Sequence, residues 1–233
     1  MSFLEARGVV RAYGRTPALR GVTLGVAEGE ILAVTGPSGC GKSTLLHCLA
    51  GILRPDAGQV TWRGERIDEW SESARSRLRR TEFGVLFQFG QLVAELTAAE
   101  NVALPLLLAG TGRREARTAA FTWLERLGVA EVADARPGEM SGGQQQRCAL
   151  ARALVTEPRV LFADEPTGAL DTLTGEQVLT QLVRLAREQR TAVVLVTHEP
   201  RIAAYADREV TLRDGAVDQS GLGLDAPVSG GHR

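Results

Sequence analysis

Hydrophobic side chains in this 233-residue chain follow two kinds of pattern. Four short runs are apolar at almost every position: Ile31–Thr35, Phe83–Phe87, Val160–Ala163 and Ala192–Thr197. A strand covered by helices on both faces has this continuous pattern, whereas a strand with one face in solvent alternates. Segments with helical spacing, such as Gln177–Glu188, lie between the runs. The alternation of buried strands and helices predicts an α/β protein with a parallel sheet.

Two other regions of the chain have different patterns. Four segments combine strand-forming residues with turn signals, and we expect them to form an antiparallel sheet beside the parallel core: Leu4–Tyr13, Gly21–Val26, Gln59–Ile67 and Glu209–Val217. Residues 90–155 are mostly helical in pattern, including Thr97–Leu108 and Arg114–Leu127, and predict an inserted helical subdomain. Residues 218–233 have no periodicity and predict a disordered tail after a domain of residues 1–217.

Composition narrows the class of protein. With 44% hydrophobic residues and 24% charged residues, the chain has the make-up of a soluble globular protein. The net charge of −1 gives it no general attraction for nucleic acid or for an anionic membrane. Its apolar stretches are shorter than a membrane span, and its first residues have no signal-peptide pattern. Cys40, Cys48 and Cys148 are too few and too irregular for a disulfide framework or zinc site, and they favour a reducing cytoplasm.

A glycine-rich segment follows the first apolar run and precedes a helical pattern. It consists of Gly36, Pro37, Ser38, Gly39, Cys40, Gly41, Lys42, Ser43 and Thr44. Glycines at this spacing let backbone N–H groups surround phosphate oxygens, and the helix N-terminus adds its positive dipole. Lys42 is the single lysine among 27 basic residues, so the narrow ammonium is used only here. We expect Lys42 to contact the β- and γ-phosphates of a nucleoside triphosphate, and Ser43 to ligate Mg²⁺.

Polar residues follow two of the other apolar runs. Asp164 and Glu165 come directly after Val160–Ala163, and His198 follows Ala192–Thr197. Because parallel strands end at the same edge of a sheet, we expect these side chains beside the phosphate loop. There Asp164 can hold Mg²⁺ and Glu165 can polarise a water for attack on the γ-phosphate. His198 is interpreted as a contact of the γ-phosphate or that water, against the alternative of a structural histidine.

The segment Met140-Ser141-Gly142-Gly143-Gln144 opens a third helical pattern. Ser141 is a candidate N-cap, and the two glycines leave the free N–H groups of the helix unobstructed. An ordinary capped helix is the simpler interpretation, but a Gly-Gly pair weakens a helix start unless a ligand approaches the backbone. A second anion-binding helix end predicts a head-to-tail pair of chains, in which each chain offers this helix to the other's nucleotide.

Together these motifs resemble those of the ATP-binding-cassette (ABC) ATPase, the nucleotide-binding subunit of ABC transporters, over nearly the whole chain to Val217. The resemblance implies a P-loop NTPase fold with a helical subdomain, ATP hydrolysis coupled to transport, and ATP and Mg²⁺ as ligands. It implies that Tyr13 stacks on adenine and that Gln88 contacts Mg²⁺ and the attacking water. The segment Gly168–Asp171 would cross the dimer interface, and Asp171 and Gln144 would complete the nucleotide sites. Met140 replaces the family's usual leucine, a volume-conserving exchange.

The branch of the family is indicated by Phe87–Pro105 and Pro166–Asp171. These segments are similar to those of macrolide exporters, lipoprotein-releasing systems and antimicrobial-peptide resistance pumps. This similarity implies two partners: a second copy or a homologous ATPase subunit, and a separate transmembrane permease. ATP hydrolysis would then drive efflux or extraction. The chain would then be cytoplasmic, held at the inner face of the membrane by its permease. The permease would dock after Gln88 on an apolar set, whose alternative role is subdomain core: Phe89, Leu92, Val93 and Leu96.

The motifs also bear on other functions within and beyond this family. A regulatory ABC ATPase, whose membrane partner controls cell-wall hydrolases, stays open. Soluble ABC ATPases that act on DNA need long coiled coils, and those that act on ribosomes carry two cassettes; neither feature is present. The basic run Arg75–Arg80 predicts a solvated helix face rather than a nucleic-acid site, so no nucleic-acid partner is expected. A P-loop kinase or GTPase would leave the helix after Ser141 unexplained.

Overall fold

The computed structural model describes residues 3–88 and 91–218. Its central sheet has six strands in the order β10-β9-β3-β8-β7-β6: β3 (Ile31–Thr35), β6 (Phe83–Leu86), β7 (Val160–Asp164), β8 (Ala192–Val196), β9 (Arg208–Arg213) and β10 (Ala216–Val217). All pairs are parallel except β10 with β9. The four apolar runs are therefore confirmed as strands of a parallel core. The predicted tail, apart from Asp218, lies outside the described residues, as does Phe89.

Both faces of the central sheet are buried, which explains the continuous apolar runs. In β7, Val160 and Phe162 belong to one hydrophobic cluster, and Leu161 and Ala163 belong to another on the opposite face. The first cluster joins the core sheet to a four-stranded antiparallel sheet of order β2-β1-β4-β5. The strands of this second sheet are β1 (Leu4–Tyr13), β2 (Thr16–Val26), β4 (Ala57–Trp62) and β5 (Glu65–Arg66). Its presence confirms the predicted antiparallel subdomain.

One predicted member of the antiparallel sheet was placed wrongly. The segment Glu209–Val217 supplies β9, which runs parallel to β3 in the core with Val34 opposite Val210. In β9, Val210 and Leu212 are buried whereas Arg213 is exposed. This alternation is typical of a strand covered on one face, and it made a core strand resemble one of the antiparallel sheet.

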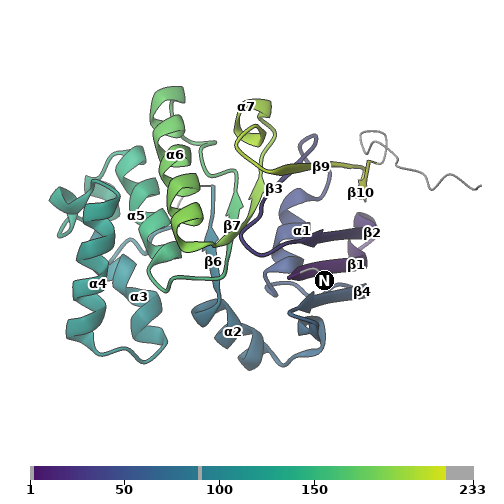
Figure 1. The fold of residues 1–233 in the computed structure, drawn as a ribbon, viewed down its shortest axis with the longest axis horizontal. Helices are drawn as coiled ribbons and strands as arrows, with labels where there is room; N and C mark the ends of the chain where they lie inside the picture. The colour runs from purple at the N-terminus through teal and green to yellow at the C-terminus, as the bar shows by residue number, and fades with distance from the viewer. Residues whose placement is uncertain (1–2, 89–90, 219–233) are drawn as a thin grey trace, which may run out of the picture.

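The second hydrophobic cluster lies on the other face of the core, beneath the helical subdomain (Figure 1). This subdomain contains α3 (Ala98–Leu108), α4 (Arg113–Arg126) and α5 (Gly142–Leu154), with 3₁₀ turns η2 (Ala130–Val132) and η3 (Pro137–Glu139). α3 begins with a capping box, in which the Thr97 side chain accepts from the Glu100 backbone and the Glu100 side chain accepts from the Thr97 backbone. In Figure 1 the subdomain forms one end of the molecule and the antiparallel sheet forms the other.

The remaining helices are α1 (Lys42–Leu49), α2 (Glu72–Thr81), α6 (Thr172–Gln189) and α7 (Pro200–Ala203), with the 3₁₀ turn η1 (Ile67–Glu69). α2 corrects the expectation of a solvated basic face, because Arg75 is buried with its guanidinium on Glu72, and Arg79 donates to the carbonyl of Gly51 at 2.6 Å. These contacts give Arg75 and Arg79 a structural role, whereas Arg77 of the same run is exposed. Among the described residues, every helix is too short or too polar to cross a lipid bilayer.

Candidate nucleotide-binding site

The carboxyl ends of β3, β7 and β8 meet at one edge of the core, and a cleft of about 930 Å³ opens there. Parallel α/β sheets bind ligands at this edge because the loops that leave neighbouring strands converge on it. The cleft is lined by Tyr13, Thr16, Pro17, Ala18, Gly36, Pro37, Ser38, Gly39, Gly41, Lys42, Ser43, Thr44, Gln88, Glu165 and His198. The structure therefore brings together most of the residues that sequence reasoning selected.

The loop between β3 and α1 needs glycine for two reasons. Gly36 and Gly41 have φ angles of 134° and 103°, which side chains rarely adopt. A Cβ on Gly36 would also lie 2.1 Å from the carbonyl oxygen of Leu212, and one on Gly41 would lie 2.3 Å from that of Ala18. The loop is thus wedged between β9 and β2. Packing against these strands holds it at the N-terminus of α1, where free N–H groups and the helix dipole favour an anion.

Lys42, the first residue of α1, is folded back into this loop. Its Nζ donates to the carbonyl oxygens of Gly36 and Pro37 at 2.7 and 2.9 Å, and the residue is only 7% exposed. Two of its three N–H groups therefore meet the loop backbone, which leaves the third for another acceptor. The loop thus places a desolvated positive charge in the cleft, as phosphate binding requires.

Two carboxylates stand at the end of β7. Asp164 Oδ1 and Glu165 Oε2 are buried and have no hydrogen-bond partner among the described residues. Glu165 has a left-handed φ of 46°, and its N–H donates to the carbonyl of Val196 at 2.9 Å, so the backbone turns sharply here. Its Oε1 lies 2.8 Å from Nδ1 of His198. Buried carboxylate oxygens without partners have free lone pairs for a cation or a water.

Tyr13 closes the cleft from the antiparallel sheet. It is 52% exposed at the end of β1, and the Arg11 guanidinium lies 5.5 Å from its ring centroid. Beside it, Thr16, Pro17 and Ala18 of β2 also line the cleft. Sequence reasoning missed these three residues because they carry no charged or reactive group. Only their position could have indicated them, because they follow Tyr13 across the β1–β2 turn.

The helix that begins after Ser141 is placed differently. The residues Ser141, Gly142, Gly143 and Gln144, all of which the structure describes, lie outside the cleft. The Ser141 Oγ caps α5 by accepting from the Gln144 N–H at 3.3 Å, and the Gln144 side chain accepts from the Ser141 N–H at 2.9 Å. This confirms Ser141 as the N-cap. Because Oγ acts as the acceptor in this bond, its O–H remains available to donate to another acceptor.

The two glycines at the start of this helix differ in how closely other residues of the same chain approach them. A Cβ on Gly143 would lie 2.5 Å from Cγ2 of Thr174 on α6, whereas one on Gly142 would meet Leu170 at an ordinary 3.6 Å. The Gly-Gly pair was interpreted only as access for a ligand. The structure adds a packing requirement at Gly143, where α5 approaches α6.

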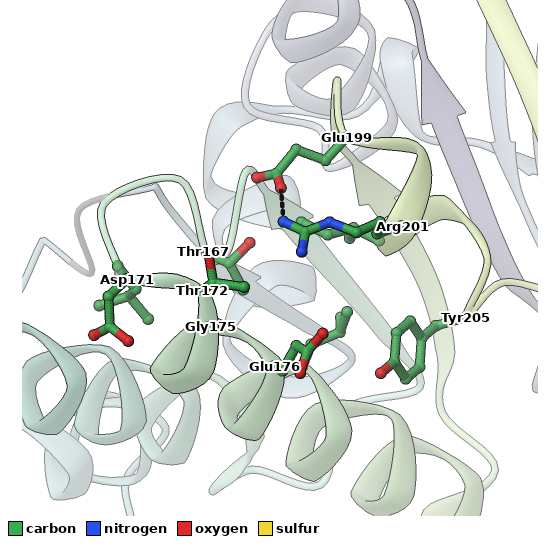
Figure 2. A pocket seen from close by; sticks show the side chains of 11 residues that line it. Thr167, Asp171, Thr172, Gly175, Glu176, Glu199, Arg201 and Tyr205 are labelled. Carbon is green, nitrogen blue, oxygen red and sulfur yellow. Dashed lines mark hydrogen bonds and ion pairs between the residues drawn. The ribbon is translucent and has the colours of Figure 1, made fainter.

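Asp171 also lies outside the cleft, at a smaller cavity of about 70 Å³ shown in Figure 2. Its carboxylate caps α6 by accepting from the Thr174 N–H at 3.1 Å, and hydrogen bonds from the Thr174 side chain and backbone hold the pKa of Asp171 below its usual value. In Figure 2, Glu199 and Arg201 pair across the top of this cavity. The Thr167 hydroxyl is buried there without a partner among the described residues.

A family model for ABC transporters matches residues 19–168. This chain belongs to the ABC transporter family. It is 47% identical over 219 residues to the lipoprotein-releasing system ATP-binding protein LolD 2 of Caulobacter vibrioides, covering 92% of this chain and 96% of that protein. The bacterial ABC transporter cassette MJ0796, solved as a dimer, superposes with a TM-score of 0.87 at 36% identity, covering 93% of this chain and 97% of that one. A dimer of MJ0796 in a post-hydrolysis state with ADP and phosphate superposes with a TM-score of 0.86 at 35% identity and also covers 93% of this chain and 97% of that one.

These similarities confirm the family, the P-loop NTPase fold and the activity predicted from sequence. The chain is an ATP-binding, ATP-hydrolysing cassette of an ABC transporter. The similar relatives are named as lipoprotein-releasing system proteins, which belong to the branch predicted from sequence.

Proposed function

We propose that two copies of this cassette close head-to-tail around two Mg-ATP molecules and drive a separate transmembrane permease that extracts lipoproteins from a membrane. The substrate class is proposed from LolD 2 of Caulobacter vibrioides, which is nearly half identical over almost its whole length. The pairing is supported by the dimeric MJ0796 cassette, which has the same fold. A closely related ATPase subunit could replace the second copy, since the same surfaces would meet.

ATP would be held mainly through its phosphates. N–H groups of the loop Gly36–Lys42 would donate to phosphate oxygens, and the third N–H of Lys42 would donate to the β- and γ-phosphates. Pro37, Ser38, Gly39, Cys40 and Thr44 belong to the same loop and helix start. The exposed ring of Tyr13 would stack on adenine at the other end of the cleft.

Three residues would hold Mg²⁺: Ser43, Asp164 and Gln88. Mg²⁺ prefers oxygen ligands and is usually held by one or two protein groups together with phosphate oxygens. The Ser43 and Gln88 side chains line the cleft, and the buried, unpartnered Oδ1 of Asp164, next to the cleft residue Glu165, fits this need. When bound, the ion would neutralise charge on the β- and γ-phosphates.

Hydrolysis would depend on Glu165 and His198. The Glu165 carboxylate would accept a proton from a water positioned for in-line attack, and Gln88 would orient that water. His198, in contact with Glu165 Oε1, would hold the carboxylate in place and contact the γ-phosphate from its other ring nitrogen. The contact between the two side chains supports a joint role.

The observation that carries the head-to-tail pairing is the position of Ser141. The exposed Ser141 and the start of α5 have the features of an anion-binding helix end, yet they do not line the cleft of their own chain. In a head-to-tail pair it would face the γ-phosphate held by the partner's loop, with Gly142, Gly143 and Gln144 beside it. Asp171, also outside the cleft, would lie at the same junction.

A permease would dock near the segment after Gln88. Val93 is 37% exposed there, whereas Leu92 packs on the helical core, so the predicted apolar set is divided between surface and interior. Docking would place the cassette at the cytoplasmic face of the membrane. A regulatory ATPase that controls cell-wall hydrolases is the weaker candidate, because the similar relatives are named for lipoprotein release.

The test is ATP hydrolysis by Glu165→Gln with Mg²⁺ present. Removing the general base should lower kcat by about 100-fold or more while ATP-dependent dimers persist and accumulate. Glu188→Gln is the matched control: the same exchange, on an acid of α6 that lies outside the cleft and pairs with Arg126. Hydrolysis by Glu165→Gln at the wild-type rate would contradict the assignment. With the permease in proteoliposomes, acylated lipoprotein should stimulate wild-type hydrolysis, and a response to cell-wall fragments alone would favour the regulatory candidate.

A further inference from the structure

A buried glutamine connects three segments of the proposed catalytic machinery. Gln146, on α5, is only 3% exposed. Its side-chain Nε2 donates to the carbonyl oxygen of Pro166 at 2.7 Å and to that of Phe87 at 3.4 Å. Both neighbours are carbonyls, so only one orientation of the amide satisfies them.

The two carbonyls belong to residues next to proposed catalytic side chains. Phe87 immediately precedes Gln88, and Pro166 immediately follows Glu165. Gln88 and Glu165 both line the nucleotide cleft. One amide group therefore joins the end of β6 to the end of β7 at the point where the strands deliver these two residues.

Gln146 lies on the buried face of its helix, among the apolar residues Ala149, Leu150 and Ala153. A polar side chain at such a position destabilises the fold unless its hydrogen bonds are satisfied. A hydrophobic residue would fill the place without that cost. The bonds to Phe87 and Pro166 therefore point to a role in positioning rather than in packing.

We propose that Gln146 is a positioning residue for ATP hydrolysis, whose amide sets the spacing between Gln88 and Glu165. This inference deepens the function proposed above and rests on it. Gln146 also stands on the helix that begins at Ser141, the group offered to the partner's nucleotide. A shift of α5 on closing against the partner would move the Gln146 amide, and with it the geometry of hydrolysis in its own chain.

The test compares Gln146→Glu and Gln146→Met with wild type in steady-state ATP hydrolysis. Glutamate keeps the shape, but its ionised carboxylate would repel both carbonyls, and methionine keeps the length without a donor. At pH 8.5 each variant should lose about tenfold in kcat, with the KM for ATP within about twofold, because a hydrogen bond is lost but no nucleotide contact is. Gln181→Glu is the control: the Gln181 amide donates to the Leu127 carbonyl from α6, away from the cleft.

The dependence on pH separates positioning from loss of structure. Burial raises the pKa of a carboxyl group, so the glutamate of Gln146→Glu should be protonated near pH 6 and donate to one carbonyl again. Its kcat, as a ratio to wild type, should then recover to within about threefold, whereas Gln146→Met should not recover. His47, Asp164, Glu165 and His198 are present in both proteins, so the ratio to wild type isolates the change made at position 146.

Three results would overturn the inference: wild-type kcat in Gln146→Met, a Gln146→Glu ratio that does not change with pH, or equal losses in Gln181→Glu. If Gln146→Glu does not fold, as thermal unfolding would show, Gln146→Met decides through its kcat and KM. Failure of the proposed function would look different. In that case, wild-type protein would itself show no hydrolysis that depends on Glu165.

Discussion

Lys42 shows how much a single side chain contributes to this site. In a chain with 26 arginines, the one lysine lies where the loop backbone leaves room for a narrow ammonium between the Gly36 and Pro37 carbonyls. A guanidinium is a wide planar fork with a fixed donor geometry. Positive charge alone therefore does not explain why position 42 is lysine. The narrow shape of the ammonium group is also required.

Lys42→Arg tests this requirement. Although the charge is kept, we expect the affinity for ATP to fall about tenfold or more, because the fork cannot enter between the two carbonyls without displacing the loop. Titration calorimetry with ATP measures the effect. Arg184→Lys, the reverse exchange on the exposed side of α6, is the control and should leave affinity unchanged. An unchanged affinity in Lys42→Arg would refute the shape argument.

Residues at strand ends were predictable from sequence, and Gln146 was not. Asp164, Glu165 and His198 each follow a buried apolar run, and the geometry of a parallel sheet brings such ends together. The side chain of Gln146 donates its hydrogen bonds to the backbone carbonyls of Phe87 and Pro166, and a backbone carbonyl is present at every position of a sequence. Its one signal was a polar residue on the apolar face of a predicted helix.

At the scale of elements, the packing of α5 against α6 sets a steric limit. The Cγ2 of Thr174 occupies the place that a Cβ on Gly143 would take. Sequence patterns predicted α5 and part of α6 but not this approach, which depends on how the helical subdomain sits on the core. For a related reason β9 was assigned to the wrong sheet: its alternation reports burial on one face, and not which strand it pairs with.

Gly143→Ala should therefore destabilise the cassette by about 1–3 kcal/mol, as an overpacked contact does. The double variant Gly143→Ala/Thr174→Ser removes the methyl group that clashes and should recover most of the loss. Gly142→Ala, whose Cβ has an ordinary 3.6 Å contact with Leu170, is the matched control. Urea unfolding measures all three. Failure of Thr174→Ser to compensate would show that the clash is not the cause.

At the scale of the whole molecule, the proposed pairing would divide each nucleotide site between two chains. One edge of the core holds the phosphate loop, the strand-end acids and His198, and the start of α5 holds Ser141 outside that cleft. The two parts are anchored in different hydrophobic clusters. α5 packs in the cluster beneath the helical subdomain, and α1, which follows the phosphate loop, packs in the cluster that joins the core to the antiparallel sheet. This division is the basis for the proposal that hydrolysis requires two chains.

The most direct test adds Ser141→Arg to the Glu165→Gln variant, in which ATP-bound dimers should accumulate. We predict that the double variant stays monomeric with Mg-ATP in analytical ultracentrifugation, because the arginine obstructs the partner's nucleotide. Its affinity for ATP as a monomer should remain within about twofold of that of Glu165→Gln, since Ser141 does not line the cleft of its own chain. Persistent dimers, or a loss of ATP binding by the monomer, would contradict the head-to-tail account.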